Sequence, residues 1–287
     1  MTERSLQVLA DTGSFYEGPR WHDGRWWVSD FYRHAVVAIT PGGAQEIIMR
    51  VDRQPSGLGW LPDGTLLVVS MKDRRVLCRT SDGEVGEVAD LSDLARWHLN
   101  DMVVDQQGRA WIGNFGYDMF SGGSPTPANI IRVDPDGTAT VVAEDMKFPN
   151  GSVVTPDDAT LIVGESAGLR YTAFTIADDG SLIDRRIWAQ PSDPPVAPDG
   201  CCLDAEDRIW AADALGNRCV RLAEGGEVLD ELRPPDGLNV YACMLGGDDG
   251  RTLLMCVAPG FLEHERASAN DAALLTVQVD IPHAGRP

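Results

Sequence analysis

The amino-acid sequence predicts an all-β protein, a six-bladed β-propeller. A two-strand unit recurs six times along the 287 residues. Successive units are spaced by 39 residues (Glu17 to Ser56) to 50 residues (Asn100 to Asn150), and this is the length that a four-stranded propeller blade occupies. The segments between the units show no helical periodicity. We therefore expect residues 1–287 to form a single propeller domain.

Each unit opens with a small or polar residue, continues with about four mostly apolar residues, and turns into a second apolar run. The units begin near Glu17, Ser56, Asn100, Asn150, Asp199 and Tyr241. Their turns are HDG, PDG, QQG, PDD, AED and DDG, which supply the positive φ angles that a tight hairpin needs. Two β-sandwiches or a solenoid are the alternatives, but neither architecture predicts six equivalent units at this period.

The ends of the chain indicate how the ring closes. After the last unit, residues Ala273 to Ile281 predict a third strand, and little chain remains for a fourth. The segment Ser5 to Ala10 precedes the first unit. Because an open ring leaves unpaired strand edges, we expect this N-terminal strand to complete the last blade.

Charge and composition exclude several classes of function. The chain has 24 basic and 44 acidic side chains, a net charge of −20, which disfavours nucleic acids and anionic membranes as partners. It has no apolar stretch of membrane-spanning length and no secretion signal, so we expect a cytoplasmic protein. A small-molecule substrate and a monomer or weak homo-oligomer fit this composition.

The opening residues of the repeats predict a metal site. First strands lie nearest the propeller axis, and Glu17, Asn100, Asn150 and Asp199 all carry a carboxylate or amide oxygen there. Gathering such groups costs desolvation and charge repulsion, which a cation would offset. For Asn150 alone, capping of a turn is the ordinary explanation; the matched set favours one divalent ion. An all-oxygen set favours Ca²⁺, with Mg²⁺ or Mn²⁺ as alternatives and Zn²⁺ least suited.

Several motifs occur in order at these same positions. They are EGPRW at Glu17, ND at Asn100 followed by GRAWIGN, PNG at Asn150 followed by TPDDATLIVGES, and PDG at Asp199 followed by LDAEDRIWAAD. Together they resemble the regucalcin-like family of senescence marker protein, gluconolactonase and luciferin-regenerating enzyme. The resemblance extends from about Glu17 to Asp280.

The resemblance implies a six-bladed propeller with one catalytic metal ion. The family's metal ligands correspond to Glu17, Asn150 and Asp199, and its further site asparagine to Asn100. Members typically hydrolyse lactones. The metal would polarise the ester carbonyl, and Asp199, as both ligand and base, would activate the attacking water. Alternatives are phosphotriesterase-like or other chemistry on the same site, since squid-type phosphotriesterases use a similar set, or a non-catalytic calcium-binding propeller.

One departure from the family pattern concerns the substrate. Sugar-lactone hydrolases of the family usually carry an arginine two residues before the site asparagine, where this sequence has His98. This change argues against a sugar acid lactone. His98 would protonate the leaving alkoxide, bind substrate, or only pack, and Arg96 is a candidate to replace the missing arginine.

Aromatic residues near the repeat openings are candidates for the substrate pocket. They are Tyr16 before Glu17, Phe115 and Tyr117 after the third unit, and Phe148 before Asn150. Aromatic walls would favour an apolar or aromatic substrate over a polyhydroxy lactone. The alternative is that these side chains only cover the ends of the blades.

Overall fold

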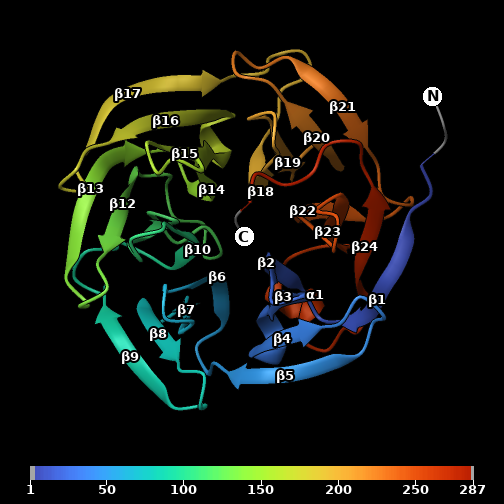
Figure 1. Cartoon of the computed structure of the whole chain (residues 1–287), viewed down its shortest axis with the longest axis horizontal. Helices are drawn as coiled ribbons and strands as arrows, with labels where there is room; N and C mark the ends of the chain where they lie inside the picture. The colour runs from blue at the N-terminus through green and yellow to red at the C-terminus, as the bar shows by residue number, and fades with distance from the viewer. Residues whose placement is uncertain (1–3, 286–287) are drawn as a thin grey trace.

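A computed structural model of the chain describes residues 4–285 and arranges them as six four-stranded antiparallel sheets around one axis (Figure 1). Five sheets follow chain order from the axis outward. They are β2 (Tyr16–His22), β3 (Arg25–Asp30), β4 (Ala35–Ile39) and β5 (Gln45–Arg50); β6 (Pro55–Trp60), β7 (Leu66–Ser70), β8 (Arg75–Arg79) and β9 (Val85–Asp90); β10 (Leu99–Val104), β11 (Ala110–Asn114), β12 (Ala128–Val133) and β13 (Ala139–Met146); β14 (Pro149–Val154), β15 (Thr160–Glu165), β16 (Arg170–Ile176) and β17 (Leu182–Ala189); β18 (Pro198–Leu203), β19 (Ile209–Asp213), β20 (Arg218–Leu222) and β21 (Val228–Leu232). The predicted fold class is confirmed.

The last blade contains both ends of the described chain. Its strands are β22 (Asn239–Gly246), β23 (Thr252–Ala258), β24 (Ala272–Gln278) and β1 (Gln7–Gly13). Strand β1 is outermost and pairs with β24, from Gln7 opposite Thr276 to Gly13 opposite Ala272. The predicted closure is thus confirmed, with β1 displaced toward Gly13 relative to the expected segment Ser5 to Ala10.

In the described part of the chain, helical structure is confined to three short pieces, η1 (Phe31–Arg33), η2 (Ser166–Gly168) and α1 (Glu263–Arg266). Within residues 4–285, none of the helices has the length and apolar character that crossing a lipid bilayer requires.

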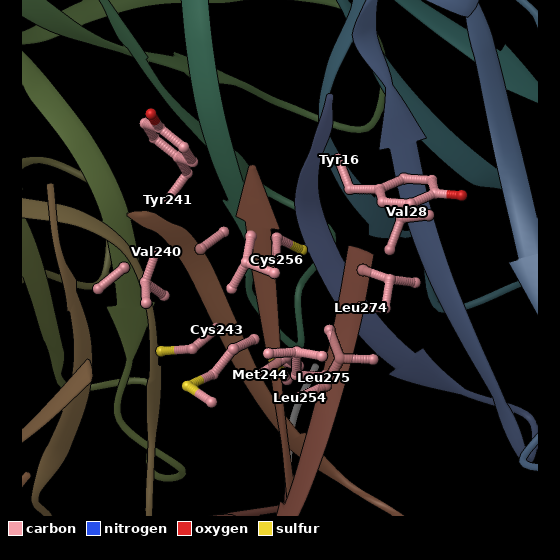
Figure 2. Close-up of a cluster of buried hydrophobic side chains, with 14 of the residues drawn as sticks. Tyr16, Val28, Val240, Tyr241, Cys243, Met244, Leu254, Cys256, Leu274 and Leu275 are labelled. Atoms are coloured by element: carbon pink, nitrogen blue, oxygen red, sulfur yellow. The ribbon is translucent and has the colours of Figure 1, made fainter. Parts of the chain in front are cut away.

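Apolar side chains fill the spaces between neighbouring blades, so each blade is held by two others. The largest cluster joins the first and last blades, and Figure 2 shows part of it, with Tyr16 and Val28 from the first blade and Val240, Leu254 and Leu274 from the last. Trp26, Trp111 and Trp210, one in each of three second strands, are among the largest fully buried side chains. The closure is therefore packed as well as hydrogen-bonded.

Every innermost strand carries a β-bulge near its start. The register shifts between Glu17 and Arg20 in β2, and at the corresponding place in β6, β10, β14, β18 and β22. In each case the inner strand has one residue more than its partner between the flanking pairs. A bulge bends a strand and redirects its side chains. It includes the opening residue in five repeats and directly follows Glu17 in the first.

The opposite end of the channel is closed by protein. A cavity of about 20 Å³ remains there, lined by residues from the ends of inner strands, including Val103, Val154 and Leu203, and by Ala284. The amide of Ala284 donates to the carbonyl of Leu203 (3.0 Å). As described for residues 4–285, this end of the channel therefore has no room for a small-molecule ligand.

Candidate functional site

Glu17, Asn100, Asn150 and Asp199 line one cavity of about 500 Å³. They come from four inner strands, β2, β10, β14 and β18. The predicted ligand set is thus brought together at the bulged end of the axis. A cavity of this size is in the range that small-molecule sites occupy.

Buried acids at the ends of second strands hold the chain just before three of these residues. Asp30 accepts hydrogen bonds from the amides of Ser14 (3.2 Å) and Phe15 (3.3 Å), ahead of Glu17. Glu165 accepts one from the Lys147 amide (2.7 Å), ahead of Asn150. Asp213 does the same for the Ala197 amide (3.0 Å), ahead of Asp199. The chain is therefore held in place just before β2, β14 and β18.

The two asparagines direct their amide nitrogens toward protein groups. Nδ2 of Asn100 donates to the carbonyl of Pro149 (3.1 Å). Nδ2 of Asn150 donates to Oγ of Ser166 (3.2 Å), which in turn donates to the carbonyl of Pro198. A carbonyl can only accept, so these partners fix which amide atom is nitrogen. The Oδ1 atoms remain available as oxygen ligands.

Glu17 and Asp199 are half-buried carboxylates that repel each other. Burial, and then the Asp199 carboxylate, raises the pKa of Glu17 well above its ordinary value. Burial also raises the pKa of Asp199; a hydrogen bond from Asn150 opposes this shift, and Asp101 adds to it. Such a pair is more stable beside a cation.

Arg20, the buried cation that acts on Glu17, is already engaged. Arg20 forms an ion pair with Asp101 (2.9 Å) and donates to the carbonyls of Pro19 and Met102. It lowers the pKa of Glu17 only as the smallest of several effects. Asp101 therefore neutralises the charge of Arg20, and the negative charge of Glu17 and Asp199 is left without a neutralising cation in the part of the chain that the structure describes.

The donor set fits a hard divalent ion. Two carboxylates and two amide oxygens are ligands of the kind that Ca²⁺ and Mg²⁺ bind. Within residues 4–285, no three His, Cys, Asp or Glu side chains are grouped as a metal site. The predicted ligand set has only two such side chains, because its other members are asparagines.

Aromatic side chains from opposite sides of the ring form the cavity walls. On one side, Phe15 packs edge-on against Tyr241, with ring centroids 4.8 Å apart. On the other, Phe115 stacks on Phe148 at 4.5 Å. Two long connections, residues 115–127 and 259–271, contribute further wall residues, among them Tyr117 and Phe261.

Comparison with known proteins identifies the family. A family model described as SMP-30/Gluconolactonase/LRE-like region matches residues 15–259. The chain belongs to this family. The resemblance seen in the repeat motifs is thereby confirmed.

Individual SMP-30/gluconolactonase-like relatives are distant. The chain is 27% identical to the pentonolactonase XacC of Haloferax volcanii, over 94% of this chain and 92% of the relative. It is 27% identical to a 6-deoxy-6-sulfogluconolactonase of Pseudomonas putida, over 66% of this chain and 64% of the relative. The crystal structure of a calcium-binding protein, regucalcin, from Agrobacterium tumefaciens has the same fold, with a TM-score of 0.82, 19% identity, and coverage of 99% of this chain and 97% of that chain.

In this SMP-30/gluconolactonase-like protein, three of the predicted substrate-binding aromatics line the cavity: Phe115, Tyr117 and Phe148. Tyr16 lies instead in the buried cluster between the first and last blades, only 2% exposed. Arg96 is exposed and is absent from the described cavity lining. A residue preceding the bulge thus points away from the axis, although it is adjacent in sequence to Glu17.

His98 lies behind the wall. Its ring stacks on Trp97, with centroids 5.0 Å apart, and lies 5.9 Å from the ring of Phe115. It is absent from the described cavity lining. Burial, and then the charge of Lys72, lowers the pKa of His98 to about 4, so the ring is neutral at pH 7. This arrangement is that of a histidine packed against aromatic neighbours.

Several residues of the site were not predicted from the sequence. Tyr32, Phe261 and Glu265 line the cavity. Tyr32 stands two residues after the end of its second strand, as Ala167 and Leu215 do in their blades, whereas Phe261 and Glu265 belong to a long connection. The clamping acids Asp30, Glu165 and Asp213 do recur at one position, the end of the second apolar run. This shared position in the repeat could have identified the three acids from the sequence.

Proposed function

We propose that this protein is a divalent-metal-dependent lactonase that opens a cyclic ester to a hydroxy acid. The observation that carries the proposal is the convergence of Glu17, Asn100, Asn150 and Asp199 on one cavity. Relatives that align with most of the chain are named lactonases, such as the pentonolactonase XacC. A lactone is a small molecule of the size that such a cavity can hold.

Glu17, Asn150 and Asp199 would hold the metal, with Asn100 beside them as a fourth oxygen donor. We favour Ca²⁺ because all the donors are oxygens. A bound divalent ion supplies Lewis-acid polarisation of the ester carbonyl and stabilises the developing oxyanion.

Asp199 is the proposed general base. Its carboxylate takes a proton from water as the water oxygen bonds to the carbonyl carbon. The ring C–O bond then breaks, and the leaving oxygen takes up a proton to give the hydroxyl of the product. Asn150 and the amide of Gly200 hydrogen-bond to Asp199, so its orientation is fixed before substrate arrives.

Calorimetric titration with Ca²⁺ and a lactone-hydrolysis assay test the proposal together. Asp199→Asn should weaken Ca²⁺ binding at least about tenfold and lower kcat at least about a hundredfold. The control Asp178→Asn removes an exposed carboxylate and should change neither. A chelator should abolish wild-type turnover, and Ca²⁺ should restore it. Hydrolysis that survives both chelator and Asp199→Asn would refute the mechanism.

A further inference from the structure

We propose that the substrate is an uncharged lactone with an aromatic or long apolar substituent, recognised by the walls of the 500 Å³ cavity. The inference rests on the proposed lactonase function and specifies its substrate class. Three features of the cavity support it: the charge of the lining, the polar groups of the walls and the apolar rim.

The described lining contains three charged side chains, and all are acidic. Glu17 and Asp199 belong to the ligand set, and Glu265 lies in the connection that follows β23. The described lining includes no lysine, arginine or histidine. Carboxylate, phosphate and sulfonate groups are generally bound by such cations. A divalent ion would balance Glu17 and Asp199. Beyond it, the described walls offer an anionic substituent no cation and one further acid, Glu265.

Several polar groups on the walls are engaged with the protein itself. The hydroxyl of Tyr32 donates to the carbonyl of Phe261. Nδ2 of Asn239 donates to the carbonyl of Pro259 (3.1 Å), and Ser166 bridges Asn150 and Pro198. Oε1 of Gln54 lines the cavity without a hydrogen-bond partner among the described residues and would accept from one substrate hydroxyl. A polyhydroxy lactone needs several such partners, and unpaired buried hydroxyls are costly, so the site discriminates against sugars.

The rim of the cavity exposes large apolar side chains. Leu215 is 77% exposed, Phe120 47% and Phe261 39%, and all three line the cavity. The other exposed large apolar residues of the described chain lie on outermost strands, β1, β5, β9, β17 and β21. An exposed apolar group at the mouth of a pocket indicates a ligand-binding role. We assign the rim to the apolar substituent of the substrate.

The first experiment compares two six-membered lactones on the metal-loaded enzyme. Dihydrocoumarin carries a fused benzene ring, and glucono-δ-lactone carries hydroxyls. We expect kcat/KM to be about seventy-fold higher for dihydrocoumarin, the factor given by burying roughly 100 Å² of additional apolar surface. An equal or higher value for gluconolactone would overturn the inference.

A second experiment changes the rim without touching the ligand set. Leu215→Arg should raise kcat/KM about threefold or more for a carboxylate-bearing lactone, paraconate, and lower it for dihydrocoumarin. The matched control is Leu229→Arg on the outermost strand β21, where the side chain is 41% exposed; it should change neither value. Equal effects of the two substitutions would show that the rim does not face the substrate.

Binding of inert lactams separates this inference from the proposed reaction. We expect calorimetry on the Ca²⁺-loaded protein to detect 3,4-dihydro-2-quinolinone, the lactam counterpart of dihydrocoumarin, and to find gluconolactam at least about tenfold weaker. If this order holds while no lactone is hydrolysed, the reaction is wrong and the cavity preference stands. Tighter binding of gluconolactam, or binding of neither lactam, would overturn the preference.

Discussion

The side chain of Asn150 has two roles, one for its amide nitrogen and one for its amide oxygen. Its nitrogen is anchored by Ser166, which itself is anchored on the carbonyl of Pro198 in the next blade. The amide oxygen is thereby left for a ligand. Groups that orient a ligand from behind typically change metal affinity ten- to a hundredfold when removed.

Ser166→Ala tests this anchoring. Without the hydroxyl, the Asn150 amide loses one of its two acceptors and keeps only Asp199, so it is held less firmly and Ca²⁺ affinity measured by calorimetry should fall about tenfold. Ser268→Ala, at an exposed position, should leave the affinity unchanged. Unaltered Ca²⁺ binding in the Ser166 variant would show that Asn150 is held by other contacts.

His98 provides a prediction in the opposite direction. Since its ring packs between Trp97 and Phe115 and not on the described cavity lining, His98→Phe should keep kcat/KM for the best lactone within about threefold. Steady-state kinetics would measure this beside Asp199→Asn. A loss of a hundredfold or more would mean that His98 takes part in proton transfer.

At the scale of elements, the repeat was predictable because its signals are local. Strand alternation, Asp/Gly turns and the phase of Glu17, Asn100, Asn150 and Asp199 all lie within short segments. The walls were only partly predictable. Phe115 and Phe148 neighbour ligand residues, but Phe261 reaches the cavity through a long connection whose path depends on contacts such as that with Tyr32.

The buried acids at the ends of the second strands were also left unpredicted, and Glu165 illustrates what keeps them charged. Burial alone would raise the pKa of Glu165, but hydrogen bonds from Arg170, Thr172 and the Lys147 amide outweigh it and hold the pKa below its ordinary value. The carboxylate is therefore charged in the folded protein, and the charge contributes to stability.

Glu165→Gln should lower the free energy of unfolding at pH 7 by about 1–3 kcal/mol. Because the pKa is lower in the folded state, this contribution is present above the ordinary value of 4.5 and is lost as pH falls through the folded value. Urea unfolding of both proteins should therefore converge in acid. Glu46→Gln, at a surface ion pair, should cost under about 1 kcal/mol. A pH-independent difference would show that Glu165 is uncharged.

At the scale of the whole molecule, stability depends on one strand from the start of the chain. Strand β1 covers the edge of β24, and an uncovered edge invites pairing with another chain. Because the ring closes between the first and last blades, loss of the closing strand β1 would weaken the packing between these two blades. The cluster of Figure 2 lies at that junction.

Deleting residues 1–12 should therefore cost at least about 3 kcal/mol of the roughly 5–15 kcal/mol typical of a folded domain. Urea unfolding would measure the loss, and light scattering should detect association through the exposed edge of β24. An unchanged unfolding midpoint and a monodisperse sample would show that three strands suffice for the last blade.

The narrow far end of the channel has a consequence for product release. Substrate and product would share one mouth, because the cavity around Val103, Leu203 and Ala284 has a volume of only about 20 Å³. Ring opening would convert a neutral guest into a carboxylate beside the ion held by Glu17 and Asp199. The described walls offer this anion no further cation, and Glu265 would repel it. Added hydroxy acid should thus compete with the lactone at the metal ion, and initial rates measured at rising product concentration should show competitive inhibition.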